Sequence, residues 1–140
     1  MLLEGNLQGI QHLGFPVTDL ERSNRFYTSL GFSQVMVVDI PDQDESVHVA
    51  MMRRNDLTLE LYQLTVEQCR EVVARGDGHI DHFAMNVIDI DKAYEEIKNA
   101  GFEIIEEKAP VFLPFWEHGV RFFTVRGPDG EKIEFSQILK

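Results

Sequence analysis

The sequence predicts an α+β fold built from two βαβββ modules that pack as a pair. Three observations predict it: a length of 140 residues, ordered motifs shared by the two halves, and the same succession of strand-like and helix-like patterns in each half. The length fits a single domain, residues 1–140, with a substantial core. A module of about 60 residues buries little core alone, so pairing is the expected solution.

The internal repeat is clearest between residues 12–32 and 82–102. At a constant offset of 70 residues, the identical pairs are His12 and His82, Val17 and Val87, Asp19 and Asp89, Gly31 and Gly101, and Phe32 and Phe102. The shared order and spacing are harder to obtain by chance than the identities alone, which indicates a duplicated unit.

A second block of the repeat lies further along each half. It matches LELYQ at 59–63 with IEFSQ at 133–137, at an offset of 74 residues. The identical pairs here are Glu60 and Glu134, and Gln63 and Gln137. The change of offset indicates a four-residue insertion between the two blocks.

The first module, residues 8–64, begins with an alternating, β-rich stretch at 9–17. The pattern Thr18-x-x-Glu21 is a capping-box signature that predicts the start of a helix. Gly31 stands where a helix C′ residue is expected, which predicts the end of this helix. Three further strands are expected at 33–39, 46–53 and 57–64.

A connecting helix is expected between the modules, at residues 65–78. Thr65 and Gln68 form a second capping-box pattern at its start. Helical spacing also places four apolar residues on one face of it: Val66, Cys69, Val72 and Val73.

The second module, residues 79–139, repeats the pattern of the first. A strand is expected at 80–88, and Asp89 or Asp91 can cap the helix that follows. The apolar stripe of this helix consists of Ile90, Ala93, Tyr94 and Ile97. The expected strands after it lie at 103–107, 111–113, 119–126 and 131–138, with a turn at 127–130.

The acidic composition excludes several classes of function. The chain has 24 acidic and 13 basic residues and a net charge of −11 at pH 7, whereas non-specific nucleic-acid binders and proteins adsorbed on anionic membranes need basic surfaces. Cys69 is the only cysteine, which excludes an internal disulfide and a Cys-based zinc cluster. The sequence shows no transmembrane run and no signal-peptide pattern, so we expect a reduced, cytoplasmic location.

Four ionisable residues occupy equivalent positions of the two modules: His12, Glu60, His82 and Glu134. All four fall in expected strands, where side chains alternate between the two faces of the sheet. Leu59 and Leu61 are expected to pack under a helix, so Glu60 points to the opposite face. The same alternation places the other three side chains on the face away from the helices.

Two imidazoles and two carboxylates suit a divalent ion such as Zn²⁺, Ni²⁺, Co²⁺, Mn²⁺ or Fe²⁺. Without a metal, two carboxylates buried together would repel and shift each other's pKa. The alternative is that each His is simply hydrogen-bonded and each Glu is solvated on an open sheet face. The recurrence of all four residues at repeat-equivalent positions favours the metal hypothesis.

Three segments carry a resemblance to a known family: HLGFPVTDLERSNRFYTSLGF, IDHFAMNVIDIDKAYEEIKNAGF and GPDGEKIEF. Over residues 8–139 the chain resembles the vicinal oxygen chelate superfamily, which includes glyoxalase I, methylmalonyl-CoA epimerase, fosfomycin-resistance proteins, bleomycin-binding proteins and extradiol dioxygenases. The resemblance implies a cup-shaped mixed sheet around a metal, and a homodimer in which a site often takes ligands from two chains. It assigns the ligands to His12, Glu60, His82 and Glu134, the pattern of glyoxalase I.

The chain departs from glyoxalase I at positions that this enzyme uses on glutathione. Pro16 stands four residues after His12, where glyoxalase I has Arg, and residues 61–63 (LYQ) occupy the stretch where it has Asn. These departures disfavour glutathione thioesters as substrates. Methylmalonyl-CoA epimerase typically has Gln at the position of Glu60, which weakens that assignment.

The leading functional hypothesis is a metal-dependent lyase, isomerase or epimerase that acts on a small substrate with two neighbouring oxygens. The metal would polarise a carbonyl and stabilise an enediolate or enolate, with Glu134 or Glu60 as the base. A second hypothesis is an Fe(II)-dependent dioxygenase that uses His12, His82 and Glu134. A third is a non-enzymatic small-molecule binding or antibiotic-resistance protein, and the complete ligand set argues against it.

An aromatic segment before the penultimate strand supplies candidate substrate contacts. Phe115, Trp116 and His118 are expected on a loop over the mouth of the site, and packing at a dimer interface is the alternative. Arg121 is a candidate for binding a substrate carboxylate, although arginines on strands are more often solvated or ion-paired.

Overall fold

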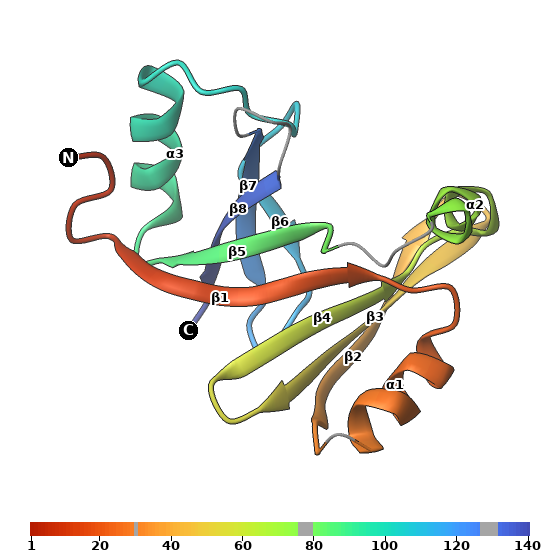
Figure 1. Ribbon diagram of the computed structural model, residues 1–140. Coiled ribbons are helices and arrows are strands. Elements are labelled where there is room, and N and C mark those ends of the chain that lie inside the picture. Colours follow the sequence, from red (N-terminus) through yellow and green to blue (C-terminus); the bar gives the residue numbers. More distant parts are fainter. Residues whose placement is uncertain (30, 76–79, 127–131) are drawn as a thin grey trace. The chain divides into compact units, whose positions relative to one another are not determined.

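The computed structural model of the protein describes residues 1–29, 31–75, 80–126 and 132–140. These ranges contain eight strands and three helices (Figure 1). In chain order they are β1 (Leu7–Pro16), α1 (Leu20–Ser29), β2 (Ser33–Asp42), β3 (Glu45–Arg54), β4 (Leu57–Gln63), α2 (Val66–Ala74), β5 (His82–Val87), α3 (Ile90–Asn99), β6 (Val111–Leu113), β7 (Val120–Arg126) and β8 (Lys132–Ile138).

The chain divides into two compact units, and the boundary between them falls inside β1. The N-half unit consists of His12–Asp81, and the C-half unit consists of Met1–Gln11 together with His82–Lys140. Each unit contains one βαβββ succession, which confirms the predicted α+β fold of two such modules. The first eleven residues lie with the second half of the sequence rather than with the first.

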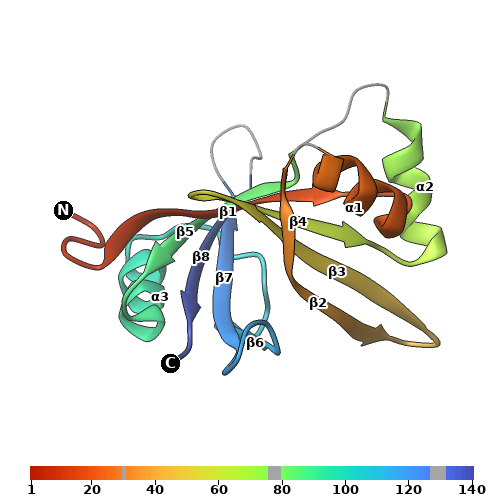
Figure 2. The same cartoon turned by 90° about the horizontal axis from the view of Figure 1, so that it is seen from below.

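The N-half unit has the strand order β2-β3-β4-β1. Strand β1 runs parallel to β4, while β2 and β3, and β3 and β4, pair in antiparallel fashion. Helix α1 lies along one face of these strands (Figure 2). The apolar side chains between them are Met52, Leu59 and Leu61, packed against Leu13, Phe15, Val17, Leu20, Tyr27 and Phe32. This face therefore holds the core of the unit.

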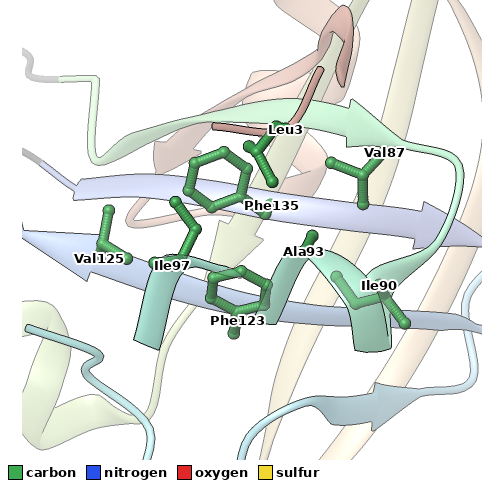
Figure 3. Packing of buried hydrophobic residues seen from close by; sticks show 8 residues of the cluster. All are labelled: Leu3, Val87, Ile90, Ala93, Ile97, Phe123, Val125 and Phe135. Atoms are coloured by element: carbon green, nitrogen blue, oxygen red, sulfur yellow. The ribbon is translucent and has the colours of Figure 1, made fainter. Parts of the chain in front are cut away.

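The C-half unit has the strand order β5-β8-β7-β6, and β5 runs parallel to β8. Helix α3 presents its apolar stripe to the strands, as its spacing predicts (Figure 3). The buried cluster consists of Leu3, Val87, Ile90, Ala93, Ile97, Phe123, Val125 and Phe135. At its centre the rings of Phe123 and Phe135 stack with centroids 5.2 Å apart.

The segment before β1 forms part of the C-half core, and Figure 1 shows it beside α3. The Leu3 side chain is buried in the cluster, and its backbone N–H donates to the Glu96 carboxylate at 2.7 Å. The buried Asn6 side chain accepts hydrogen bonds from the backbone N–H groups of Ile88 and Asp89, at 2.6 and 2.7 Å, just before α3 begins. This segment thus fixes the turn that leads into α3.

Helices α1 and α3 begin in the same way. The carboxylate of Asp19 accepts from the backbone N–H of Arg22 at 2.9 Å, and that of Asp89 accepts from Lys92 N–H at 3.0 Å. The expected capping box at Thr18 was therefore placed one residue too early, because an aspartate at the next position is an equally strong N-cap. Asp89, one of the two alternatives for α3, is confirmed as its N-cap.

The same two helices also end alike, at the predicted glycines. Gly31 and Gly101 have positive φ angles of 88° and 82°. In each case the N–H of the following residue returns to the carbonyl five positions earlier, Phe32 to Tyr27 and Phe102 to Ile97. This is the Schellman arrangement, which needs the left-handed backbone that glycine adopts without strain.

The strand expected at 103–107 is wrong: the structure has only a bridge between Ile104 and Val125 there. The Glu106 carboxylate accepts from the backbone N–H of Thr124 at 2.8 Å, so a side chain takes a position that a strand carbonyl would occupy. Pro110, which has no N–H, follows shortly after. The other expected strands and helices are found among the described residues, although α2 ends at Ala74 and residues 76–78 of the expected connecting helix lie outside those residues. None of the described helices is long and apolar enough to cross a membrane.

Candidate functional site

His12 and Glu60 form a buried pair in the N-half unit, here called the N-half pair. The Nε2 atom of His12 lies 2.8 Å from a carboxylate oxygen of Glu60, and the side chains are 4% and 11% exposed. They come from the parallel strands β1 and β4, where Gly14 is in register with Glu60. Leu59 and Leu61 point into the α1 core, so the pair lies on the opposite face, as the alternation predicts.

His82 and Glu134 form the corresponding pair in the C-half unit, the C-half pair. The Nε2 atom of His82 lies 3.6 Å from a carboxylate oxygen of Glu134, and the side chains are 11% and 12% exposed. They come from the parallel strands β5 and β8, where Ala84 is in register with Glu134. Phe135 packs in the α3 core, so this pair also lies away from the helix.

The two pairs share one construction. In each unit the histidine stands two positions before the residue in register with the glutamate, on the neighbouring parallel strand. Two residues along a strand return to the same face, which brings imidazole and carboxylate together. The sequence repeat is thus a repeated His–Glu pair in space, and each pair offers one nitrogen and one oxygen ligand.

Tyr62 extends the polar face of the N-half unit beyond Glu60. It stands two residues after Glu60 on β4, so both side chains occupy the same face. Burial raises the pKa of the Tyr62 hydroxyl, and a hydrogen bond to Asp81 and the charges of Asp81 and Glu60 raise it further. The phenol therefore stays protonated and remains a hydrogen-bond donor.

The aromatic segment at residues 115–118, which was expected to contact substrate, contains both buried and exposed side chains. Phe115 is buried, and Trp116 takes a positive φ of 64°. His118 is exposed, with its Nε2 atom 3.7 Å from the carboxylate of Glu117. None of these contacts identifies a substrate, so a role for the segment stays a prediction.

Arg121 lies on the helix-covered face of β7, opposite the face that carries Glu134. Its register partner on β8 is Gln137, and its guanidinium donates two hydrogen bonds, at 2.7 and 2.8 Å, to the Asp91 carboxylate of α3. These hydrogen bonds lower the pKa of Asp91. The ion-paired alternative for this arginine therefore matches the structure, with the guanidinium engaged on the face opposite Glu134.

Neither Tyr62 nor Asp81 was among the predicted site residues, although strand alternation places Tyr62 on the face of Glu60. The period-2 relation of Tyr62 to Glu60 was an available signal, whereas nothing in the sequence pairs Tyr62 with Asp81. Residues 127–131, which carry the start of the GPDGEKIEF motif and its expected turn, lie outside the described residues.

Residues 9–135 match the model of the Glyoxalase/Bleomycin resistance protein/Dioxygenase superfamily. The chain belongs to this superfamily. The match extends over both His–Glu pairs and both βαβββ modules, and it confirms the family resemblance noted in the sequence.

One curated relative and several solved structures are similar to this superfamily member over most of its length. The chain is 29% identical over 132 residues to the uncharacterized protein YwbC of Bacillus subtilis (strain 168), covering 91% of this chain and 96% of YwbC. A methylmalonyl-CoA epimerase variant of Streptomyces coelicolor, solved with 2-nitronate-propionyl-CoA, is 23% identical with a TM-score of 0.77, over 96% of this chain and 99% of that chain. The Mycobacterium tuberculosis methylmalonyl-CoA epimerase is 20% identical with a TM-score of 0.75, over 96% and 90%. At these identities the solved structures show the glyoxalase-like fold.

Proposed function

We propose that the protein is a metal-dependent isomerase or lyase of the glyoxalase type, with His12, Glu60, His82 and Glu134 as the ligands of one divalent ion. The observation that carries this proposal is the pair of equivalent, buried His–Glu contacts, one in each unit. Membership of the superfamily supports it, because metal-dependent isomerases and lyases belong to this family. We further propose that the active form is a homodimer.

The donor set fits a divalent ion. Imidazole nitrogen and carboxylate oxygen are ligands that Zn²⁺, Ni²⁺, Co²⁺, Mn²⁺ and Fe²⁺ accept. The imidazole nitrogen and the carboxylate oxygen lie 2.8 Å apart in the N-half pair and 3.6 Å apart in the C-half pair, so small movements allow both atoms of a pair to bind the same ion. All four side chains are at most 12% exposed, and buried carboxylates are stable only when a cation or hydrogen bonds offset their charge.

The chemistry that we propose is proton transfer at a carbon next to a carbonyl. A bound divalent cation supplies Lewis-acid polarisation of that carbonyl. A glutamate carboxylate takes the proton from the carbon, and the C–H electrons move toward the carbonyl to give an enolate. Protonation of the opposite face of that carbon, or of the neighbouring carbon, then gives the product, and exchange of the abstracted proton with solvent lets deuterium enter the C–H position. We assign this base to Glu134, because its histidine is 3.6 Å away, whereas Glu60 is held by His12 at 2.8 Å.

The substrate that we propose is a small acid or thioester with two neighbouring oxygens. The solved epimerase of Streptomyces coelicolor holds 2-nitronate-propionyl-CoA, so acyl-CoA thioesters are the first class to test. Methylmalonyl-CoA is the natural starting compound, followed by 2-oxo and 2-hydroxy thioesters.

The experiment has two parts. Protein purified without chelators is analysed for metals by mass spectrometry, and we expect about one divalent ion per chain. Exchange of the substrate C–H in D₂O is then followed by NMR, before and after a chelator and after metal is restored. Exchange that persists unchanged in the apo protein would contradict the proposal. Oxygen uptake with catechols instead of C–H exchange would favour the dioxygenase alternative.

A further inference from the structure

Tyr62 and Asp81 are joined by a hydrogen bond inside the N-half unit, beside the N-half pair. The Tyr62 hydroxyl donates to the Asp81 carboxylate. Tyr62 lies on β4 two residues after Glu60, and Asp81 directly precedes His82 in the chain. The contact therefore joins a residue two positions from Glu60 to the residue next to His82, and both Glu60 and His82 are proposed metal ligands.

The backbone of Asp81 is held by β1. Its N–H donates to the carbonyl of Gly14 at 2.8 Å, and Gly14 is the β1 residue in register with Glu60. Tyr62 is fixed in turn, because its carbonyl accepts from the Val17 N–H at 2.9 Å. Asp81 is thus anchored through both backbone and side chain, next to the strand position of Glu60.

The Tyr62 phenol is suited to a permanent contact. It projects from β4, which is paired with β1 on one side and with β3 on the other, so the backbone that carries it is fixed. Arg75 contributes an opposite charge near both partners while its guanidinium is engaged by Glu71 at 2.8 and 2.7 Å. A carboxylate acceptor with an undissociated phenol donor makes a charge-assisted hydrogen bond, which is stronger than a neutral one.

We propose that Tyr62 and Asp81 are a positioning pair for the metal site. They fix Asp81, the residue immediately before His82 in the chain, onto the strands of the N-half unit that carry His12 and Glu60. The inference rests on the proposed function, because it concerns the proposed metal ligands. Neither residue is proposed to touch the ion, and the effect passes through the chain from Asp81 to His82.

Metal affinity of single variants tests the pair. Tyr62→Phe removes the donor and keeps the ring, and Asp81→Ala removes the acceptor. Groups behind metal ligands typically change metal affinity by about 10- to 100-fold, so we expect each variant to weaken Co²⁺ binding by at least about tenfold in competition with a chelator. The visible spectrum of bound Co²⁺ should change in shape, which a loss of general stability would not produce.

Three controls separate positioning from folding. Asp81→Asn keeps an oxygen acceptor for the phenol and should retain most of the affinity. Tyr27→Phe removes a hydroxyl from the α1 core of the same unit and should leave Co²⁺ binding unchanged. The double variant of Tyr62→Phe and Asp81→Ala should be no weaker than the worse single variant, because both remove one interaction.

The outcomes are distinct. If the wild-type protein binds Co²⁺ and both single variants bind it with the same affinity and spectrum, the positioning pair is wrong and the proposed metal site stands. If the wild-type protein binds no divalent ion, the proposed function fails and this inference fails with it. If Asp81→Ala does not fold, the near-isosteric variants Tyr62→Phe and Asp81→Asn still test the inference. Co²⁺ affinity should fall in Tyr62→Phe and be retained in Asp81→Asn, and unchanged affinity in Tyr62→Phe would contradict the positioning pair.

Discussion

The Oε1 atom of Gln137 accepts a hydrogen bond of 3.0 Å from the backbone N–H of Ile90, the first residue of α3. Gln63 makes the equivalent bond, at 2.7 Å, to the N–H of Leu20 at the start of α1. Both glutamines lie near the end of the last strand of their module, β4 or β8. The repeat therefore includes a link from the glutamate-bearing strand to the helix N-terminus.

We expect Gln63→Ala and Gln137→Ala each to lower the free energy of unfolding by about 1 kcal/mol. Each change leaves a helix N-terminal N–H without its partner, and lost hydrogen bonds of this kind have about this cost. Urea unfolding followed by circular dichroism measures the change. Gln63→Glu and Gln137→Glu are the matched controls, because a carboxylate still accepts the bond and suits the helix N-terminus. Equal losses in the Ala and Glu variants would contradict this interpretation.

The N-terminal segment should be essential to the C-half unit. Leu3 is 5% exposed within its core cluster, whereas the neighbouring Leu2 is 46% exposed. Leu3→Ala is expected to lower the free energy of unfolding by about 2–4 kcal/mol, because it leaves a cavity in packed surroundings. Leu2→Ala has the same chemistry without the burial and should change it by no more than about 0.5 kcal/mol. Similar effects of the two changes, measured in urea, would show that the segment does not pack as described.

The modules could be predicted from the sequence because their signals are local and occur twice. The glycines that end both helices, the aspartate before α3 and the sheet face of the four His and Glu residues follow from fixed spacings. Leu3 could not be assigned to the C-half core, because the residues before β1 show no periodicity and contact a helix some 90 residues away.

The errors have the same origin in non-local structure. No strand forms at 103–107, because the Glu106 carboxylate accepts a hydrogen bond from the Thr124 N–H, and no local sequence pattern reveals this contact. The Tyr62–Asp81 contact joins residues 19 positions apart, and no local pattern pairs them. Of the proposed site, its residue types and faces were predictable, whereas the contacts that support them were visible only in three dimensions.

The Asp91–Arg121 ion pair gives stability that depends on pH. The hydrogen bonds from Arg121 lower the pKa of Asp91 in the folded protein below its unfolded value. The pair therefore contributes fully to the free energy of unfolding above the pKa of Asp91 in the unfolded chain, about 4. This contribution is lost as the pH falls through the lower pKa of Asp91 in the folded protein.

We expect the wild-type protein to exceed Asp91→Asn in free energy of unfolding by at most about 1 kcal/mol at pH 7, because the pair is largely exposed. The difference should shrink below about pH 4 and in high salt. Urea titrations of both proteins between pH 3 and 7 measure it. Glu67→Gln, at an exposed ion pair on α2 with Arg70, is the control for a change of surface charge. A difference that grows as the pH falls would contradict the sign.

The assignment of Glu134 as the base predicts unequal effects at the two proposed carboxylate ligands. Glu134→Gln keeps an amide oxygen but cannot take up a proton, so C–H exchange in D₂O should fall by about 10²- to 10⁴-fold. Glu60→Gln keeps an oxygen ligand beside His12 and should lower exchange far less. Metal content, measured in both variants, separates loss of the base from loss of the ion. Glu103→Gln, at an exposed carboxylate in the C-half unit, should leave exchange unchanged. A larger loss in Glu60→Gln with metal retained would move the base to the N-half pair.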